Sequence, residues 1–159
     1  MPLTWAALQE LQGVVLGSCS APFRRGVARA KQGQEQYGCW EGMEQRFAER
    51  LALAPSVAPH PVARAAMLYL DLCFFHPFED GNARAARLAL DYTLSYAGLA
   101  LGDCGLVFAL PIPAGRRGAY LDFLARVVRA CEMAAVRQGS ARAADGLTGR
   151  RKGNGAPGI

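Results

Sequence analysis

The sequence of 159 residues has no long uninterrupted run of apolar residues. Its most apolar stretch, VARAAMLYLDLCFF at residues 62–75, carries an arginine and an aspartate and is shorter than the ~20 residues that a membrane-spanning helix needs. The opening residues, MPLTWAALQELQG, lack the basic start and the unbroken apolar segment of a signal peptide. We therefore expect a cytoplasmic protein that does not enter a membrane.

Paired cysteines are also missing. The five cysteines are widely spaced, and no two of them form a CxxC pair. This spacing argues against a zinc site and against a disulfide framework, and it fits a reducing cytoplasm. The sequence has no internal repeat and no long linker, and its length suits one domain with a core of its own. We place that domain at residues 1–138.

Acidic residues are fewer than basic ones. The chain has 13 Asp and Glu against 18 Lys and Arg, which gives a net charge of +5. A basic balance can indicate nucleic-acid binding. However, part of the charge lies in residues 139–159, a Gly-rich segment without aromatic residues that is typical of a disordered tail. The other arginines are scattered, so we do not expect a nucleic-acid partner.

Apolar residues at helical spacing predict an all-α domain. The expected helices cover residues 4–17, 41–53, 61–75, 82–96 and 117–137. The segment 61–75 begins with proline in the favoured first turn and is apolar on nearly every side, so we expect it in the middle of the domain. Pro55 is expected to lie beyond the end of the helix before it.

Two segments between these helices are expected to be extended. Residues 23–38, FRRGVARAKQGQEQYG, contain three glycines and predict a short hairpin or an extended loop. The stretch LVFAL at residues 106–110 predicts a short extended segment in the connection before the last helix.

The stretch HPFEDGNARAAR at residues 76–87 places polar side chains between two apolar helices. The second helix is expected to begin near Asn82, so Gly81, Asn82 and Ala83 would present free backbone N–H groups. These groups lie at the positive end of a helix dipole, which makes a ready anion site. Gly81 also lacks the Cβ atom that would obstruct a close approach by phosphate.

The other polar residues of this stretch suit phosphate chemistry. Arg84 and Arg87 are three residues apart, so both forked side chains can lie on one side of the helix, where they would suit phosphate oxygens. The Asp80 carboxylate could hold a magnesium ion that bridges phosphates. A neutral His76 imidazole could take a proton from an incoming hydroxyl. Each residue alone has an ordinary structural explanation, but together they outline a phosphate-transfer site.

This pattern resembles the signature of the Fic domain family, HPFx[D/E]GNGRxxR. The matching positions are His76, Pro77, Phe78, Asp80, Gly81, Asn82, Arg84 and Arg87. The resemblance covers about residues 20–135 and implies a Fic-like helical bundle with a small β-hairpin flap within residues 23–38. It also implies a protein adenylyltransferase, an enzyme that transfers AMP from ATP to a hydroxyl side chain of a target protein.

The resemblance assigns a role to each matching polar residue. His76 would be the base that deprotonates a Ser, Thr or Tyr hydroxyl of the target. Asp80 would bind Mg²⁺. Asn82 and the surrounding N–H groups, those of Gly81 and Ala83, would hold the α-phosphate of ATP. The outer phosphates would be bound by two side chains, Arg84 and Arg87. The flap could pair with an extended target segment as an added strand.

Ala83 departs from the signature, which has glycine at this position. Doc-type relatives carry lysine there and phosphorylate their targets, but alanine supplies no such side chain. The donor and the transferred group therefore stay open: phosphate, UMP or phosphocholine transfer are alternatives. A Fic-fold protein that binds a nucleotide or a partner without chemistry is a further alternative. A plain DNA-binding helical module would leave the cluster at residues 76–87 unexplained.

Many Fic proteins carry an inhibitory helix with a motif resembling [S/T]xxxE[G/N]. The nearest stretch is SARAADG, where Asp145 replaces the glutamate and lies one residue too far from Ser140. We therefore identify no clean copy of the motif. Inhibition could instead come from a separate small antitoxin protein, as in a toxin–antitoxin pair, or it could be absent.

Overall fold

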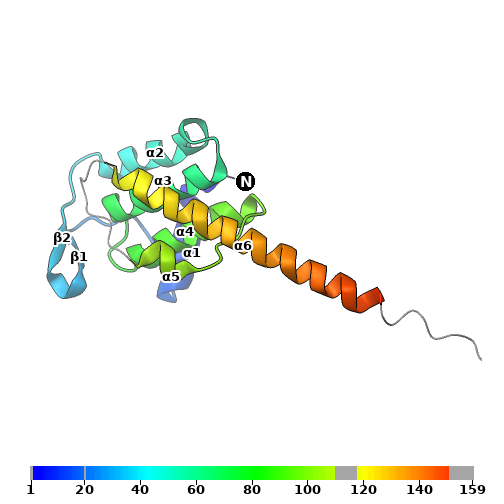
Figure 1. Cartoon of the computed structure of the whole chain (residues 1–159). Coiled ribbons are helices and arrows are strands. Elements are labelled where there is room, and N and C mark those ends of the chain that lie inside the picture. The colour runs from blue at the N-terminus through cyan, green and yellow to red at the C-terminus, as the bar shows by residue number, and fades with distance from the viewer. Residues whose placement is uncertain (1, 20, 110–117, 151–159) are drawn as a thin grey trace, which may run out of the picture.

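Helices make up most of the computed structural model, which describes residues 2–19, 21–109 and 118–150 (Figure 1). The described elements are α1 (Trp5–Leu16), β1 (Ala28–Ala30), η1 (Lys31–Gly33), β2 (Glu35–Tyr37), α2 (Met43–Val57), α3 (Pro61–Phe75), α4 (Asn82–Tyr96), α5 (Cys104–Phe108) and α6 (Ala119–Arg150). The prediction of an all-α fold with one small hairpin is confirmed.

The helix α3 lies in the middle of the bundle, as its sequence predicts. It packs most extensively against α4 and also contacts α2 and α6, while α1 covers another side of α4. In Figure 1, α6 crosses the front of the bundle, and the β1–β2 hairpin projects at the side. The connection between the two central helices therefore lies at one end of the bundle core.

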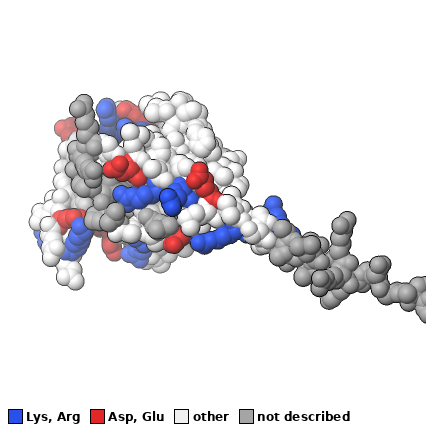
Figure 2. Space-filling model, viewed as in Figure 1, with Lys and Arg blue, Asp and Glu red and all other residues white. Residues whose placement is uncertain are grey.

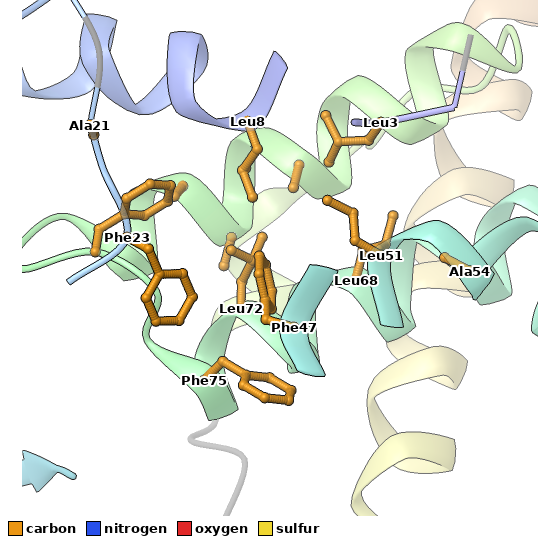
Figure 3. Close-up of a cluster of buried hydrophobic side chains, with 14 of the residues drawn as sticks. Leu3, Leu8, Ala21, Phe23, Phe47, Leu51, Ala54, Leu68, Leu72 and Phe75 are labelled. Atoms are coloured by element: carbon orange, nitrogen blue, oxygen red, sulfur yellow. The ribbon is translucent and has the colours of Figure 1, made fainter. Parts of the chain in front are cut away.

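Two hydrophobic clusters hold these helices together. In the first, side chains from α1, α2 and α3 point toward one another, among them Phe47, Leu72 and Phe75 (Figure 3). The second lies between α3, α4, α5 and α6, with Phe123 and Val127 fully buried. Burial of such side chains supplies the main driving force for folding. Both clusters contain residues of α3, which explains why this helix is apolar on nearly every side.

The sequence predicts three helices closely. The first begins after Thr4, whose hydroxyl accepts a hydrogen bond from the Ala7 N–H at 3.2 Å, the N-cap arrangement that the sequence favours. The central helices run over residues 61–75 and 82–96, within the predicted limits. Gly98, with φ 72°, follows the second of them and ends it as expected.

Other boundaries differ from the predictions. The helix α2 continues through Pro55 to Val57, because the buried residues Leu51 and Ala54 pack against the core and outweigh the loss of one N–H donor. The prediction of an extended segment at residues 106–110 is wrong for residues 106–108. The chain forms α5 there, and the Asp103 carboxylate caps it by accepting from the Gly105 N–H at 2.8 Å.

The last helix is longer than predicted. It begins at Ala119 and continues to Arg150, whereas a disordered tail was expected from residue 139. Alanine and arginine are good helix formers, which favours this extension. Among the residues whose side chains are described, Ala134 is the last buried one, and beyond it the helix projects from the bundle (Figure 1). Residues 151–159 lie outside the described part of the chain.

The predicted hairpin lies at residues 28–37. Its strands β1 and β2 pair antiparallel, with Ala28 opposite Tyr37 and Ala30 opposite Glu35. The connection passes through three residues with positive φ, ending in Gly33, so the chain reverses direction within a few residues. This geometry presents the Tyr37 side chain beside the end of α3.

Neither the described helices nor the face seen in Figure 2 shows a membrane segment or a basic stripe. No helix within residues 2–19, 21–109 and 118–150 is both long enough and apolar enough to cross a membrane. On the face shown in Figure 2, acidic and basic side chains are interspersed. That face offers no continuous basic surface of the kind that binds nucleic acid.

Candidate active site

The polar connection between α3 and α4 and the first two turns of α4 carry the predicted site residues. The connection begins at His76, the C-cap of α3, whose backbone has φ 45° and ψ 61° and whose N–H donates to the Leu72 carbonyl at 3.0 Å. A residue other than glycine pays about 1 kcal/mol or more for this left-handed conformation. The surrounding contacts must therefore hold His76 in place.

Asn82 ties the two ends of the loop together. Its Oδ1 atom accepts from the Phe78 N–H at 2.9 Å, and its Nδ2 atom donates to the Phe78 carbonyl at 2.7 Å. The Phe78 ring is fully buried and stacks on Trp5, with ring centroids 5.5 Å apart. Both polar groups of the Asn82 side chain are therefore engaged, and its backbone N–H, which has no partner within α4, is a further donor for the predicted contact with phosphate.

The start of α4, where the sequence predicts an anion site, leaves several backbone donors free. Gly81 is the N-cap, with φ 74°, and no side chain caps this helix. The N–H groups of Asn82, Ala83 and Arg84 have no carbonyl partner within the helix, because the first such bond runs from Ala85 to Gly81. These donors and the helix dipole favour a bound anion.

The two arginines of the motif turn toward different neighbours. The Arg84 guanidinium lies 3.4 Å from the Val15 carbonyl of α1 and 3.5 Å from the Asp80 carboxylate. The Arg87 guanidinium lies over the Phe108 ring of α5, 4.6 Å from its centroid. Both side chains are exposed, so an anion at the helix start could be approached from two sides.

Asp80 is exposed and has a carboxylate that could reach a metal ion. One of its oxygens accepts from the Gly81 N–H at 2.6 Å, and 81% of the side chain is accessible. Among the described residues, no group of three or more His, Cys, Asp or Glu side chains could hold a metal ion. A single carboxylate beside an anion site fits Mg²⁺, which keeps several waters and binds phosphate oxygens.

The His76 imidazole lies under the hairpin. Its ring stacks on Tyr37, with centroids 3.3 Å apart and planes inclined by 14°. Burial lowers the pKa of His76 below its ordinary value of 6.5, and the positive charge of Arg24 acts in the same direction. The backbone at Cys73 and the Glu35 carboxylate oppose this shift. The imidazole is therefore neutral near pH 7, as a general base must be.

Sequence reasoning missed the contribution of Arg24. This arginine is 3% exposed and donates to the carbonyls of Phe75 and His76, at the point where α3 ends. No local pattern distinguishes the buried Arg24 from the exposed Arg25 next to it.

Sequence reasoning also missed Gln12, which lies under the loop. Its Nε2 atom donates to the Asp80 carbonyl at 2.6 Å, and its side chain is fully buried. A Cβ atom added at Gly81 would lie 2.5 Å from this Nε2 atom. A polar residue four positions after the buried Leu8, on the same side of α1, was the available signal.

A cavity of about 690 Å³ opens beside the hairpin rather than at the loop. It is lined by residues 23–25 and 39–45. None of the predicted site residues lines it, but Arg24 contributes to both this cavity and the end of α3.

The site and the fold match a known family. The model of the Fic/DOC family matches residues 2–94, which include the whole stretch HPFEDGNARAAR. Because this match covers more than half of the 159 residues, the chain belongs to the Fic/DOC family.

Curated relatives carry the name protein adenylyltransferase Fic. The one from Drosophila virilis is 36% identical over 80 residues, which are 50% of this chain and 15% of that relative. The one from Culex quinquefasciatus is 43% identical over 53 residues, 33% of this chain and 11% of that relative. The matched segment is thus a small part of these longer proteins.

A solved structure supports the fold independently. The crystal structure of a Fic domain containing signaling protein from Bacteroides thetaiotaomicron is similar, with a TM-score of 0.55 at 18% sequence identity. The similarity covers 84% of this chain and 62% of that one. At this identity it shows a shared fold.

Proposed function

We propose that this chain transfers AMP from ATP to a hydroxyl side chain of a target protein. The observation that carries the proposal is the arrangement of one short connection. It holds a half-buried imidazole with a lowered pKa at the end of α3 and an uncapped helix start, flanked by two exposed arginines, at the beginning of α4. The relatives named protein adenylyltransferase support the same chemistry.

Each residue of the loop has a part in the proposed reaction. His76 accepts the proton of the target hydroxyl as its oxygen forms a bond to the α-phosphorus, and pyrophosphate leaves. The N–H groups at the start of α4 stabilise the charge that develops on the α-phosphate. Arg84 and Arg87 bind the outer phosphates. Mg²⁺, held by Asp80 together with phosphate oxygens, would neutralise part of the phosphate charge.

The side chain at Ala83 bears on which group is transferred. Its N–H lies among the first donors of α4, so the methyl group leaves the donor in place. Alanine has no charged group to place near an outer phosphate, which favours AMP transfer over phosphate transfer. Transfer of UMP or phosphocholine, or binding without chemistry, are the alternatives that the experiment below separates.

The proposal includes a protein partner. Phe74 and Trp40 have exposed side chains that form an edge-to-face contact, with centroids 6.5 Å apart, next to the end of α3. They offer a target segment an apolar surface close to His76. We further propose that the protein acts in the cytoplasm and that a separate small antitoxin or inhibitor protein controls it.

A labelling experiment tests the transferred group. Purified protein, Mg²⁺ and cell lysate are incubated with ATP labelled at the α-phosphate or at the γ-phosphate, with His76→Ala as the control. Label from the α-phosphate on a protein, lost in the control, is the expected result. Label from the γ-phosphate alone indicates phosphorylation. Equal results for wild type and control with ATP, UTP, GTP and CDP-choline would overturn the enzyme proposal.

A further inference from the structure

Arg24 is a buried cation that meets only main-chain oxygens and one sulfur among its described contacts. The side chain is 3% exposed, and the distance of its Nη2 atom to the Met43 sulfur is 3.8 Å. None of the ion pairs that the structure describes involves it. Burying a charge without a partner of opposite charge is costly unless its donors are satisfied. An arginine at this position therefore requires an explanation.

Three consecutive residues, at the end of α3 and the start of its connection to α4, accept hydrogen bonds from Arg24. Its backbone N–H donates to the Pro77 carbonyl at 2.8 Å, its Nε atom donates to the His76 carbonyl, and its Nη2 atom donates to the Phe75 carbonyl at 3.2 Å. Carbonyls at the end of a helix have no partner within it and carry the negative end of the dipole. These oxygens therefore stabilise the buried charge.

The same guanidinium also holds both ends of the hairpin. Its Nη1 atom donates to the carbonyl of Gly26, just before β1, and its Nη2 atom donates to that of Gly38, just after β2, at 2.7 Å. The hairpin between them carries Tyr37, whose ring stacks on His76. One planar group with five donors thus joins the main chain of His76 to the segment that covers its imidazole.

We propose that Arg24 is a positioning residue for His76: it fixes the left-handed main chain at His76 and anchors the hairpin that covers the imidazole. This inference rests on the proposed role of His76 as general base. Arg24 itself does not touch the substrate. A lysine could supply the charge at this position but not a planar fork that reaches carbonyls on both the loop and the hairpin.

The pKa of the His76 imidazole is a direct measure of this positioning role. The groups that face it are Arg24, the Glu35 carboxylate, the Tyr37 ring and the backbone at Cys73. Removal of Arg24 takes away a positive charge and loosens the cover, and both changes raise the pKa of His76. Movement of the hairpin would also weaken the opposing effect of Glu35, but that effect is the smallest of the causes.

The first test is an NMR titration of the histidine imidazoles in wild type, Arg24→Met, Arg24→Lys and Arg50→Met. The sequence contains two histidines, and the exposed His60 serves as an internal reference. We expect Arg24→Met to raise the pKa of His76. A folded Arg24→Met protein with an unchanged His76 pKa would overturn the proposal.

Arg50→Met is the matched control for stability. Arg50 bonds to the mostly buried Asp71 carboxylate at 2.7 Å, between α2 and α3, so its loss weakens the fold without touching the loop. We expect this variant to keep the wild-type His76 pKa and transfer rate. If Arg24→Met does not fold, Arg24→Lys decides the question, because it keeps the charge and loses the fork.

The second test is kinetic and separates binding from chemistry. We expect Arg24→Met to lower kcat for AMP transfer by roughly 10²-fold, as for a misplaced catalytic group, with KM for ATP within about twofold. Arg24→Lys should recover less than a tenth of that loss. Full recovery of kcat by Arg24→Lys would contradict the positioning role. If wild type transfers no label, the proposed function fails, whereas the NMR titration still tests how Arg24 places His76.

Discussion

The side-chain amide of Gln12 donates a hydrogen bond to the main-chain carbonyl of Asp80, 68 positions later in the chain, at 2.6 Å. The Gln12 Oε1 atom is buried and has no partner among the described residues. The helix α1 therefore supports the loop from below, while Asn82 closes it from within. A buried acceptor without a partner lowers the stability of the fold. This loss is consistent with a functional requirement for the position of the loop.

Gly81 should tolerate substitution poorly because Gln12 occupies the space beside it. A Cβ atom at Gly81 would lie 2.5 Å from the Gln12 Nε2 atom, and the backbone φ of 74° is strained for alanine. We expect Gly81→Ala to lower the free energy of unfolding by roughly 2–4 kcal/mol, from strain plus overpacking. Urea denaturation measures the loss.

Gly98→Ala is the matched control for this prediction. Gly98 has φ 72°, and nothing lies within 4 Å of a Cβ atom added there. It should lose only the strain, about 1–2 kcal/mol. Equal losses for the two variants would show that the contact between Gly81 and Gln12 is unimportant.

Asn82→Ala should destabilise the loop and the whole domain. It leaves the N–H and the carbonyl of the buried Phe78 without their partners, and each such group costs about 1–3 kcal/mol. We expect a loss of roughly 2–4 kcal/mol in thermal or urea unfolding. Asn82→Asp keeps one acceptor but turns a second oxygen toward the Phe78 carbonyl. Wild-type stability in that variant would contradict the two-bond arrangement.

Activity should depend on pH through His76. Because burial lowers its pKa below 6.5, the neutral imidazole already predominates at pH 6.5, and transfer should fall as the pH drops through the lowered pKa. Tyr37→Ala uncovers the ring, so the pKa of His76 rises and the acid limb of the pH–rate profile moves to higher pH. Tyr37→Phe keeps the stacked ring and should behave like wild type. A profile that is the same in both variants would exclude a role for the stacked ring.

The free energy of unfolding should also depend on pH through the protonation of His76. The unfolded chain binds the His76 proton at higher pH than the folded chain does. The contribution of His76 is therefore fully present above pH 6.5 and is lost as the pH falls through the lower folded pKa.

Phe108 should contribute to ATP binding through Arg87. The Arg87 guanidinium lies 4.6 Å from the Phe108 ring centroid, and such contacts at exposed sites are worth about 0.5–1 kcal/mol. Phe108→Leu should therefore raise KM for ATP about two- to fivefold while kcat stays near the wild-type value. Tyr96→Leu, at the exposed C-terminal end of α4, is a control for the loss of an aromatic ring. An unchanged KM in Phe108→Leu would show that the contact between Arg87 and Phe108 does not contribute to ATP binding.

The sequence predicts the parts of the fold that depend on local signals. The Thr4 cap, the proline at the start of α3 and the glycine after α4 each mark an end that the structure confirms. Local signals failed where packing decides the outcome. Pro55 is accommodated within α2 because its neighbours are buried, and no pattern in the sequence of α2 alone shows that burial.

The candidate site shows the same division. The motif identifies His76 and the start of α4 because its residues are close together in the chain. Arg24 and Gln12 reach the loop from 52 and 68 positions away, so only the folded chain brings them there. The roles of Asp80 and the arginines toward metal and phosphate stay predictions.

The stacking of Phe78 on Trp5 has a consequence for heat resistance. The ring is fully buried in the same aromatic cluster as Phe47 of α2, so the loop shares the core that holds α1 and α2. Such a loop cannot unfold locally before the rest of the domain, because its unfolding would expose the aromatic cluster. Loss of the proposed AMP transfer on warming should therefore coincide with cooperative unfolding, and the temperature optimum of that transfer should lie just below the Tm.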